Sequence, residues 1–185
     1  MATVDALLLA PGAGADRESP ALVAVEQAVG VPVARMHFPY RKEGRKAPDR
    51  APKLIAAVLE EAAALATTAG VAPERIALGG RSMGGRICSM AVAEGLPASA
   101  LVLMSYPLHP PGKPEKLRIE HFPQITVPCL FIGGDRDPFG APDELEHHTA
   151  AIAGPVTHVW VSGGHSSKGQ DPHIATTVAE WLASL

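Results

Sequence analysis

The stretch Arg75-Ile-Ala-Leu-Gly-Gly-Arg-Ser-Met-Gly-Gly-Arg86 joins a short apolar run, a glycine-rich turn and the start of a helical pattern. The apolar run at 76–78 is typical of a buried strand, and the apolar positions 87, 90 and 91 lie on one face of a helix. Ser82 lies at the junction, inside a G-x-S-x-G motif. A sharp strand-to-helix turn needs glycines, because side chains there would collide with the neighbouring backbone. The stretch therefore predicts a nucleophilic Ser82 in a strained conformation with its hydroxyl exposed.

The alternative for the same stretch is a glycine-rich turn that carries an inert serine. Such a turn can arise by chance, because the chain has 18 glycines among its 185 residues. The motif alone is thus only a hypothesis. The predicted strand before it and the predicted helix after it favour the nucleophile, since that context is the one in which the motif acts.

Apolar runs and helical patterns alternate along the rest of the chain. Strands are predicted over 4–10, 33–38, 76–78, 100–105, 129–132 and 156–161, and helices over 20–29, 49–69, 83–94, 142–153 and 171–185. Near-continuous apolar strands separated by helices predict a parallel sheet that is covered on both faces. The expected fold class is α/β: a three-layer α/β/α sandwich around a six-stranded, mostly parallel sheet. The length fits a single domain over residues 1–185.

Glycine-rich and polar segments follow four of these strands. Gly12-Ala-Gly14 follows the first strand, Ser82 the third, Asp135 and Asp137 the fifth, and His165 the sixth. The carboxyl ends of parallel strands meet at one edge of the sheet, where ligands bind. These segments are therefore predicted to form one site.

The residue types in these segments suit nucleophilic catalysis. Serine needs a base within hydrogen-bond reach, and the base needs an acid to orient it. His165 is the candidate base, and Asp137 is preferred to Asp135 as the acid because it lies further into its loop. Spacing alone does not separate the two aspartates, and a turn aspartate that binds its own backbone is the alternative for either.

Two backbone N–H groups are the candidates for binding an oxyanion, those of Met83 and Ala13. The candidate pocket residues are Gly12, Gly14, Arg81, Tyr106, His109 and Phe139.

Composition and spacing argue against several other classes of protein. A net charge of −3 and 4% aromatic residues do not indicate nucleic-acid binding. No apolar stretch has the length of a membrane span, and residues 1–10 lack the basic start of a signal peptide, so a cytoplasmic protein is expected. Cys88 and Cys129 are interpreted as buried thiols.

No metal or cofactor is expected. The pair Asp135 and Asp137 has no His or Glu at fitting spacing. The glycines at 12 and 14 are followed by Arg17 where a dinucleotide fingerprint needs its third glycine.

Basic residues are frequent between Arg41 and Arg50, and Arg81 and Arg86 flank Ser82. One interpretation is attraction of an acidic substrate. The preferred one is a solvated loop with local ion pairs to Glu43 and Asp49.

The chain resembles the α/β-hydrolase superfamily, and within it the small dienelactone-hydrolase-like branch that includes testis-expressed hydrolase-like proteins. The matching stretches are Leu9-Ala-Pro-Gly-Ala-Gly-Ala15, Phe38-Pro-Tyr40, Gly80-Arg-Ser-Met-Gly-Gly-Arg86, Tyr106-Pro-Leu-His109, Phe131-Ile-Gly-Gly-Asp-Arg-Asp-Pro-Phe-Gly140 and Gly164-His165. The resemblance implies a minimal hydrolase fold without a cap domain, a serine hydrolase site with Asp137 as the acid, and no cofactor. The chain departs from the branch at Pro11, where a histidine is usual, and at Ser82, where true dienelactone hydrolases have cysteine.

The expected activity is cleavage of a small ester or similar acyl substrate through an acyl-Ser82 intermediate. The alternative is a non-catalytic hydrolase-like interaction domain, since some relatives serve as scaffolds. A transacylase, which differs only in its acceptor, is a third interpretation. The oligomeric state and the substrate do not follow from the sequence.

Overall fold

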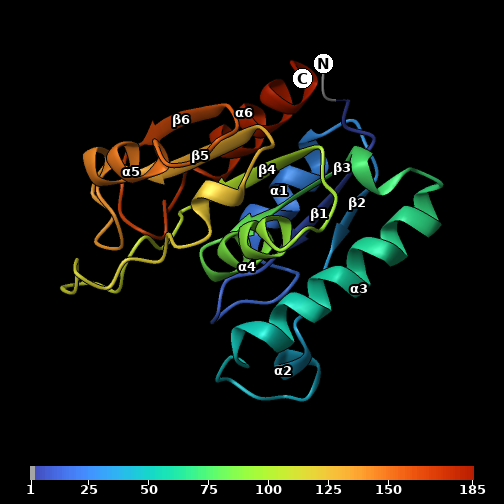
Figure 1. Ribbon diagram of the computed structural model, residues 1–185, viewed down its shortest axis with the longest axis horizontal. Helices are drawn as coiled ribbons and strands as arrows, with labels where there is room; N and C mark the ends of the chain where they lie inside the picture. Colours follow the sequence, from blue (N-terminus) through green and yellow to red (C-terminus); the bar gives the residue numbers. More distant parts are fainter. Residues whose placement is uncertain (1–2) are drawn as a thin grey trace.

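The computed structural model describes residues 3–185, which form a six-stranded sheet with helices on both faces (Figure 1). The strands are β1 (Ala6–Ala10), β2 (Val33–Arg35), β3 (Ile76–Arg81), β4 (Ala100–Met104), β5 (Cys129–Gly134) and β6 (Val156–Val161). They lie in the order β2-β1-β3-β4-β5-β6, and every neighbouring pair is parallel. The predicted parallel sheet is confirmed.

Two helical layers cover the sheet. The helices are α1 (Pro20–Ala28), α2 (Pro39–Lys42), α3 (Ala51–Ala69), α4 (Met83–Ala93), α5 (Pro142–Thr149) and α6 (Asp171–Ala183), with 3-10 turns η1 (Pro73–Arg75) and η2 (Phe122–Gln124). Leu8 of β1 belongs to the core beneath α3 and α4, whereas Leu7 and Leu9 belong to the core beneath α1 and α6. Side chains alternate along a strand, so a fully apolar strand supplies both layers.

Helices α1 and α6 pack against each other on one face of the sheet. Leu22 and Val25 of α1 share a buried cluster with Ile174 and Val178 of α6. The second layer of the sandwich therefore joins the beginning of the described chain to its end.

Five of the six predicted strands differ in length from the observed ones, most of all the second and the third. The second strand ends at Arg35 rather than Phe38, because Pro39 has a fixed φ that suits a first helical turn and starts α2. The third strand extends beyond Leu78 to Arg81, because Gly79 and Gly80 still pair with both neighbouring strands. The apolar pattern of a sequence depends on side chains, so it does not show where the backbone pairing of a strand ends.

The connection from β4 to β5 carries no cap domain. Between residues 105 and 128 the only regular helix is the 3-10 turn η2. The carboxyl edge of the sheet is therefore bordered by loops alone. Within residues 3–185, none of the helices is both long and apolar enough to cross a bilayer.

Candidate active site

Ser82 forms the turn between β3 and α4. Its backbone has φ 51° and ψ −120°, a conformation that L-residues rarely adopt, and its N–H donates to the Met104 carbonyl at 2.8 Å. A Cβ at Gly80 or Gly84 would lie 2.1 or 2.2 Å from the Ala10 carbonyl oxygen. The two glycines are thus required by the close approach of β1, and they let the turn present Ser82 at the sheet edge.

Ser82, His165 and Asp137 form a hydrogen-bonded chain across three loops. The Ser82 Oγ lies 2.8 Å from the His165 Nε2, and the His165 Nδ1 lies 2.8 Å from the Asp137 Oδ2. The Asp137 side chain is 3% exposed, and its Oδ1 accepts a 2.9 Å bond from the Phe139 N–H. An ionised Asp137 would accept a hydrogen bond from the His165 Nδ1–H, which leaves the Nε2 lone pair directed at the serine hydroxyl.

Asp135 has a different place in the same loop. Its side chain is 48% exposed, and its Oδ1 accepts a 2.8 Å bond from the Gly163 N–H. This bond links the loop after β5 to the loop after β6 on which His165 lies. The structure thus brings Asp137, and not Asp135, to the histidine.

Two further side chains hold His165 in position. The Phe139 ring stacks on the imidazole with centroids 4.0 Å apart and planes at 28°. The Arg81 Nη2 donates a 3.0 Å bond to the His165 carbonyl. Both residues were predicted as pocket residues, and both line the cavity beside Ser82. Their contacts with His165 could not be predicted, because they depend on how distant loops meet.

The loop after β1 lies against the Ser82 turn. A Cβ at Gly12 would lie 3.7 Å from the Ser82 Cβ, so this position brings backbone close to the nucleophile. The Tyr40 hydroxyl donates a 2.8 Å bond to the Ala13 carbonyl and anchors the loop. Within residues 3–185, the N–H groups of Met83 and Ala13 have no hydrogen-bond acceptor, so both are available to an oxyanion.

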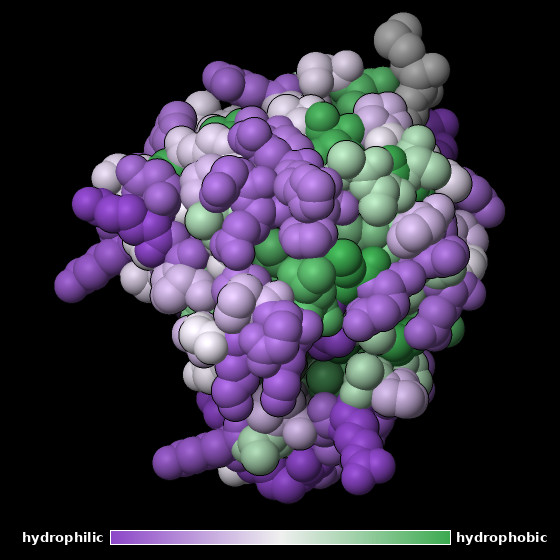
Figure 2. Space-filling model, turned by 60° about the vertical axis from the view of Figure 1, so that its left-hand side comes forward, coloured by the Kyte–Doolittle hydropathy of each residue, from purple (hydrophilic) through white to green (hydrophobic). Residues whose placement is uncertain are grey.

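The cavity at this edge has a volume of about 570 Å³. It is lined by the predicted residues Gly12, Ala13, Gly14, Arg81, Ser82, Met83, Phe139 and His165. The sequence analysis missed Arg118 altogether and did not place Arg86 in the pocket, although both line it. Figure 2 shows the side that lies at the left of Figure 1, where hydrophobic residues gather around a hollow among hydrophilic side chains.

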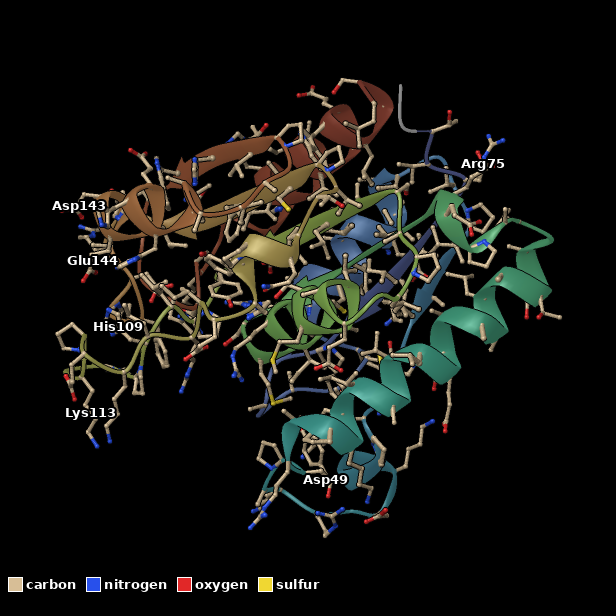
Figure 3. The ribbon with its side chains drawn as sticks, in the orientation of Figure 1. Asp49, Arg75, His109, Lys113, Asp143 and Glu144 are labelled. Atoms are coloured by element: carbon tan, nitrogen blue, oxygen red, sulfur yellow. The ribbon has the colours of Figure 1, made fainter. Side chains whose placement is uncertain are left out.

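The pocket predictions for Tyr106 and His109 are wrong. Tyr106 is 2% exposed, and its hydroxyl donates a 2.7 Å bond to the Arg118 carbonyl beneath the connection. His109 turns toward α5, where its Nε2 lies 3.5 Å from the Glu144 Oε2 (Figure 3). The connection from 107 to 123 has no periodicity, so the sequence does not indicate which way its side chains point.

The remaining sequence predictions concern the basic segment and the thiols. Arg45 pairs with Glu43 at 2.5 Å and with Asp49 at 2.8 Å, which confirms the predicted local ion pairs. Cys88 and Cys129 are free and buried, and burial raises the pKa of each thiol to about 12. Residues 3–185 contain no cluster of three potential metal ligands.

A parallel sheet with a G-x-S-x-G turn after a central strand, an acid after a later strand and a histidine after the last strand defines the α/β-hydrolase class. The chain belongs to the alpha/beta hydrolase domain family, whose pattern matches residues 3–182.

Solved structures with this fold include three close in size to the chain. A putative hydrolase of the alpha/beta superfamily from Xanthomonas campestris is 22% identical, with a TM-score of 0.74 over 98% of this chain and 99% of that one. Est1E from Butyrivibrio proteoclasticus, solved with ferulic acid, is 15% identical, with a TM-score of 0.81 over 100% of this chain and 90% of that one. The type II thioesterase BorB from the borrelidin biosynthetic cluster is 18% identical, with a TM-score of 0.72 over 98% of this chain and 94% of that one. These likenesses concern the fold.

Proposed function

We propose that the protein is a serine hydrolase that cleaves a small ester or thioester through an acyl-Ser82 intermediate. The observation that carries the proposal is the chain of two 2.8 Å contacts from Ser82 through His165 to Asp137. A serine hydroxyl is activated only when a base of this kind lies within hydrogen-bond reach. Among the solved structures of the same fold, an esterase from Pyrobaculum calidifontis and the thioesterase BorB support a hydrolytic reaction.

The proposed reaction has two halves. The Ser82 Oγ attacks the substrate carbonyl carbon while the His165 Nε2 takes the hydroxyl proton, and the carbonyl oxygen becomes an oxyanion between the Met83 and Ala13 N–H groups. The carbon–heteroatom bond then breaks, and His165 returns the proton to the leaving group. In the second half a water molecule attacks the acyl-enzyme, His165 takes one of its protons, and Ser82 leaves with that proton as the acid is released.

The open cavity favours small substrates. It is bordered by loops rather than by a cap domain, and a long acyl chain would lie in solvent. Within the family, we propose the carboxylesterase or the dienelactone-hydrolase-like branch, with Ser82 in place of that branch's cysteine.

The test is covalent labelling with a fluorophosphonate probe, read by mass on the intact protein and on its peptides. Labelling at Ser82 in the wild type, together with its loss in Ser82→Ala and in His165→Ala, is the expected result. Circular dichroism of all three proteins shows whether they are folded. Absence of labelling in folded wild type would refute an activated serine and would favour the interaction domain.

A further inference from the structure

The cavity beside Ser82 carries an excess of positive charge. Arg81, Arg86 and Arg118 line it, and among residues 3–185 no aspartate or glutamate does. Asp137, which belongs to the hydrogen-bonded chain with Ser82, is buried and already bonded to His165. The whole protein has a net charge of −3, so this excess is local.

None of the three arginines has an ion-pair partner within 4.0 Å in the described part of the chain. Other arginines are paired, for example Arg35 with Glu26 at 2.7 Å and Arg75 with Asp5 at 2.6 Å. Arg81 donates from its Nη2 to the His165 carbonyl at 3.0 Å, and Arg118 donates from its Nη1 to the Pro107 carbonyl at a longer 3.4 Å. Arg86 and Arg118 are therefore two cavity-lining charges that have no counter-charge in the described part of the chain.

Arg86 also has an unsatisfied buried donor. Its Nε is buried and has no hydrogen-bond partner within residues 3–185. Leaving a buried charged donor unpaired costs free energy, and such groups in native proteins usually have a reason. An anion bound in the cavity would offset the charge of the guanidinium to which this donor belongs.

The positions of these two arginines relative to the nucleophile are fixed by the backbone. Arg86 follows Ser82 by four residues, and its N–H donates to the Ser82 carbonyl at 3.1 Å, so both residues lie on one face of the first turn of α4. Arg118 approaches from the connection, where its carbonyl accepts the Tyr106 hydroxyl at 2.7 Å and its N–H donates to the Leu108 carbonyl at 2.9 Å.

The carboxylate of Glu120 acts on His121 from nearby, but it forms no ion pair with Arg86 or Arg118. Burial and the Arg86 charge lower the pKa of His121 to about 4, and burial and the same charge lower the pKa of Arg118. His121, whose Nε2 lies 2.8 Å from the Ser89 Oγ next to the Arg86 turn, is therefore neutral at neutral pH. Two like charges are thus held near one another, and an anionic ligand would reduce their repulsion.

Resting on the proposed hydrolase function, we propose that the acyl substrate carries a carboxylate or phosphate group that Arg86 and Arg118 bind while Ser82 attacks the acyl carbon. Guanidinium groups suit this role, because their fixed donors match the oxygens of both anions. The substrate class is then an anionic ester or thioester, such as a half-ester of a dicarboxylic acid, rather than a neutral ester.

The test compares paired esters that differ only in charge. On the acyl side the pair is 4-nitrophenyl hydrogen glutarate and its neutral methyl ester. On the alcohol side it is 4-carboxyphenyl butyrate and its neutral methyl ester. The measured quantity is the ratio of kcat/KM for the anionic ester to that for the neutral one, and the pair that shows the preference locates the anion relative to the scissile bond.

In wild type we expect the anionic member of one pair to be preferred. That ratio is expected to fall by about 10- to 100-fold in Arg86→Gln and in Arg118→Gln, the loss typical of one hydrogen-bonded ion pair. Lys113→Gln is the matched control: it removes one positive charge from the same connection, but Lys113 is exposed and points away from the body of the protein (Figure 3). Its ratio is expected to stay within about two-fold, the scale of a weak surface charge effect.

A wild-type ratio near one for both pairs would overturn the inference, and so would equal losses in Lys113→Gln and the two arginine variants. Failure of the proposed function would look different, since no ester would be cleaved and Ser82 would not be labelled. Calorimetric titration of glutarate and of butyl phosphate into folded Ser82→Ala tests the anion site without turnover. If a ligand binds, and the binding is lost when Arg86→Gln is added to Ser82→Ala, the inference is supported and the ligand identifies the preferred anion. If neither ligand binds, the inference is overturned.

Discussion

Replacing Asp137 by asparagine tests the proposed chemistry most directly, because the structure fixes how the amide must sit. The Phe139 N–H, 2.9 Å from the Asp137 Oδ1, needs an acceptor, so the amide oxygen of Asn takes that place. The amide NH₂ then faces the His165 Nδ1, at the present 2.8 Å contact. A donor at this position requires the Nδ1 to be unprotonated, which moves the imidazole proton to Nε2.

The Nε2 then has no lone pair with which to take the proton of the Ser82 hydroxyl, 2.8 Å away. General-base catalysis is worth about 10²- to 10⁴-fold, and loss of the correct tautomer in a serine–histidine–aspartate site costs about 10⁴-fold. We therefore expect the reactivity of Ser82 to fall by about 10³- to 10⁴-fold, while the geometry of the fold is kept.

The second-order rate constant for fluorophosphonate labelling of Ser82 is the suitable measurement, because it does not require the natural substrate. Asp135→Asn is the matched control: its carboxylate binds the Gly163 N–H rather than His165, so the rate is expected to stay within about ten-fold of wild type. The reasoning is refuted if folded Asp137→Asn keeps a tenth or more of the wild-type rate. It is also refuted if Asp135→Asn loses as much as Asp137→Asn.

Two predictions concern stability. Gly84→Ala would place a Cβ 2.2 Å from the Ala10 carbonyl oxygen, so it should lower the free energy of unfolding by about 3 kcal/mol or more. In Gly30→Ala the added Cβ meets no atom within 4 Å, so the free energy of unfolding should change by less than about 1 kcal/mol. Urea denaturation measures both values. The pKa of His121 falls from its ordinary 6.5 to about 4 on folding, so the unfolded chain takes up the proton first. The melting temperature should therefore drop more between pH 6.5 and 4 in wild type than in His121→Asn; parallel curves would contradict this.

The sheet could be predicted because its strands are buried on both faces. A strand such as Ala6–Ala10, in which every residue is buried, reads as one apolar run in the sequence. The loop partners Ser82 and His165 could be predicted because parallel strands all end at one edge. The full length of β3 could not be predicted, because its last residues include Gly79 and Gly80, which pair through backbone groups and add nothing to the apolar pattern.

The arginine pair could not be predicted in the same way. Arg118 lies in a connection without periodicity, and its place over the cavity depends on a bond from the Tyr106 hydroxyl to its carbonyl. A tyrosine that supports a distant backbone leaves no pattern in the sequence. The same holds for Tyr40, whose hydroxyl anchors the Ala13 carbonyl.

The packing of α1 against α6 has a consequence for synthesis on the ribosome. The apolar stripe of α1, with Leu22 and Val25, finds its cover on Ile174 and Val178, which are translated last among the described helices. A nascent chain therefore carries an uncovered hydrophobic stripe during most of its elongation, a state that favours aggregation or chaperone binding. The serine and histidine are 83 residues apart, so a chain that stalls before β6 also lacks its base. Such non-local contacts slow folding, and reactivity should arise only after the segment that carries His165 has left the ribosome.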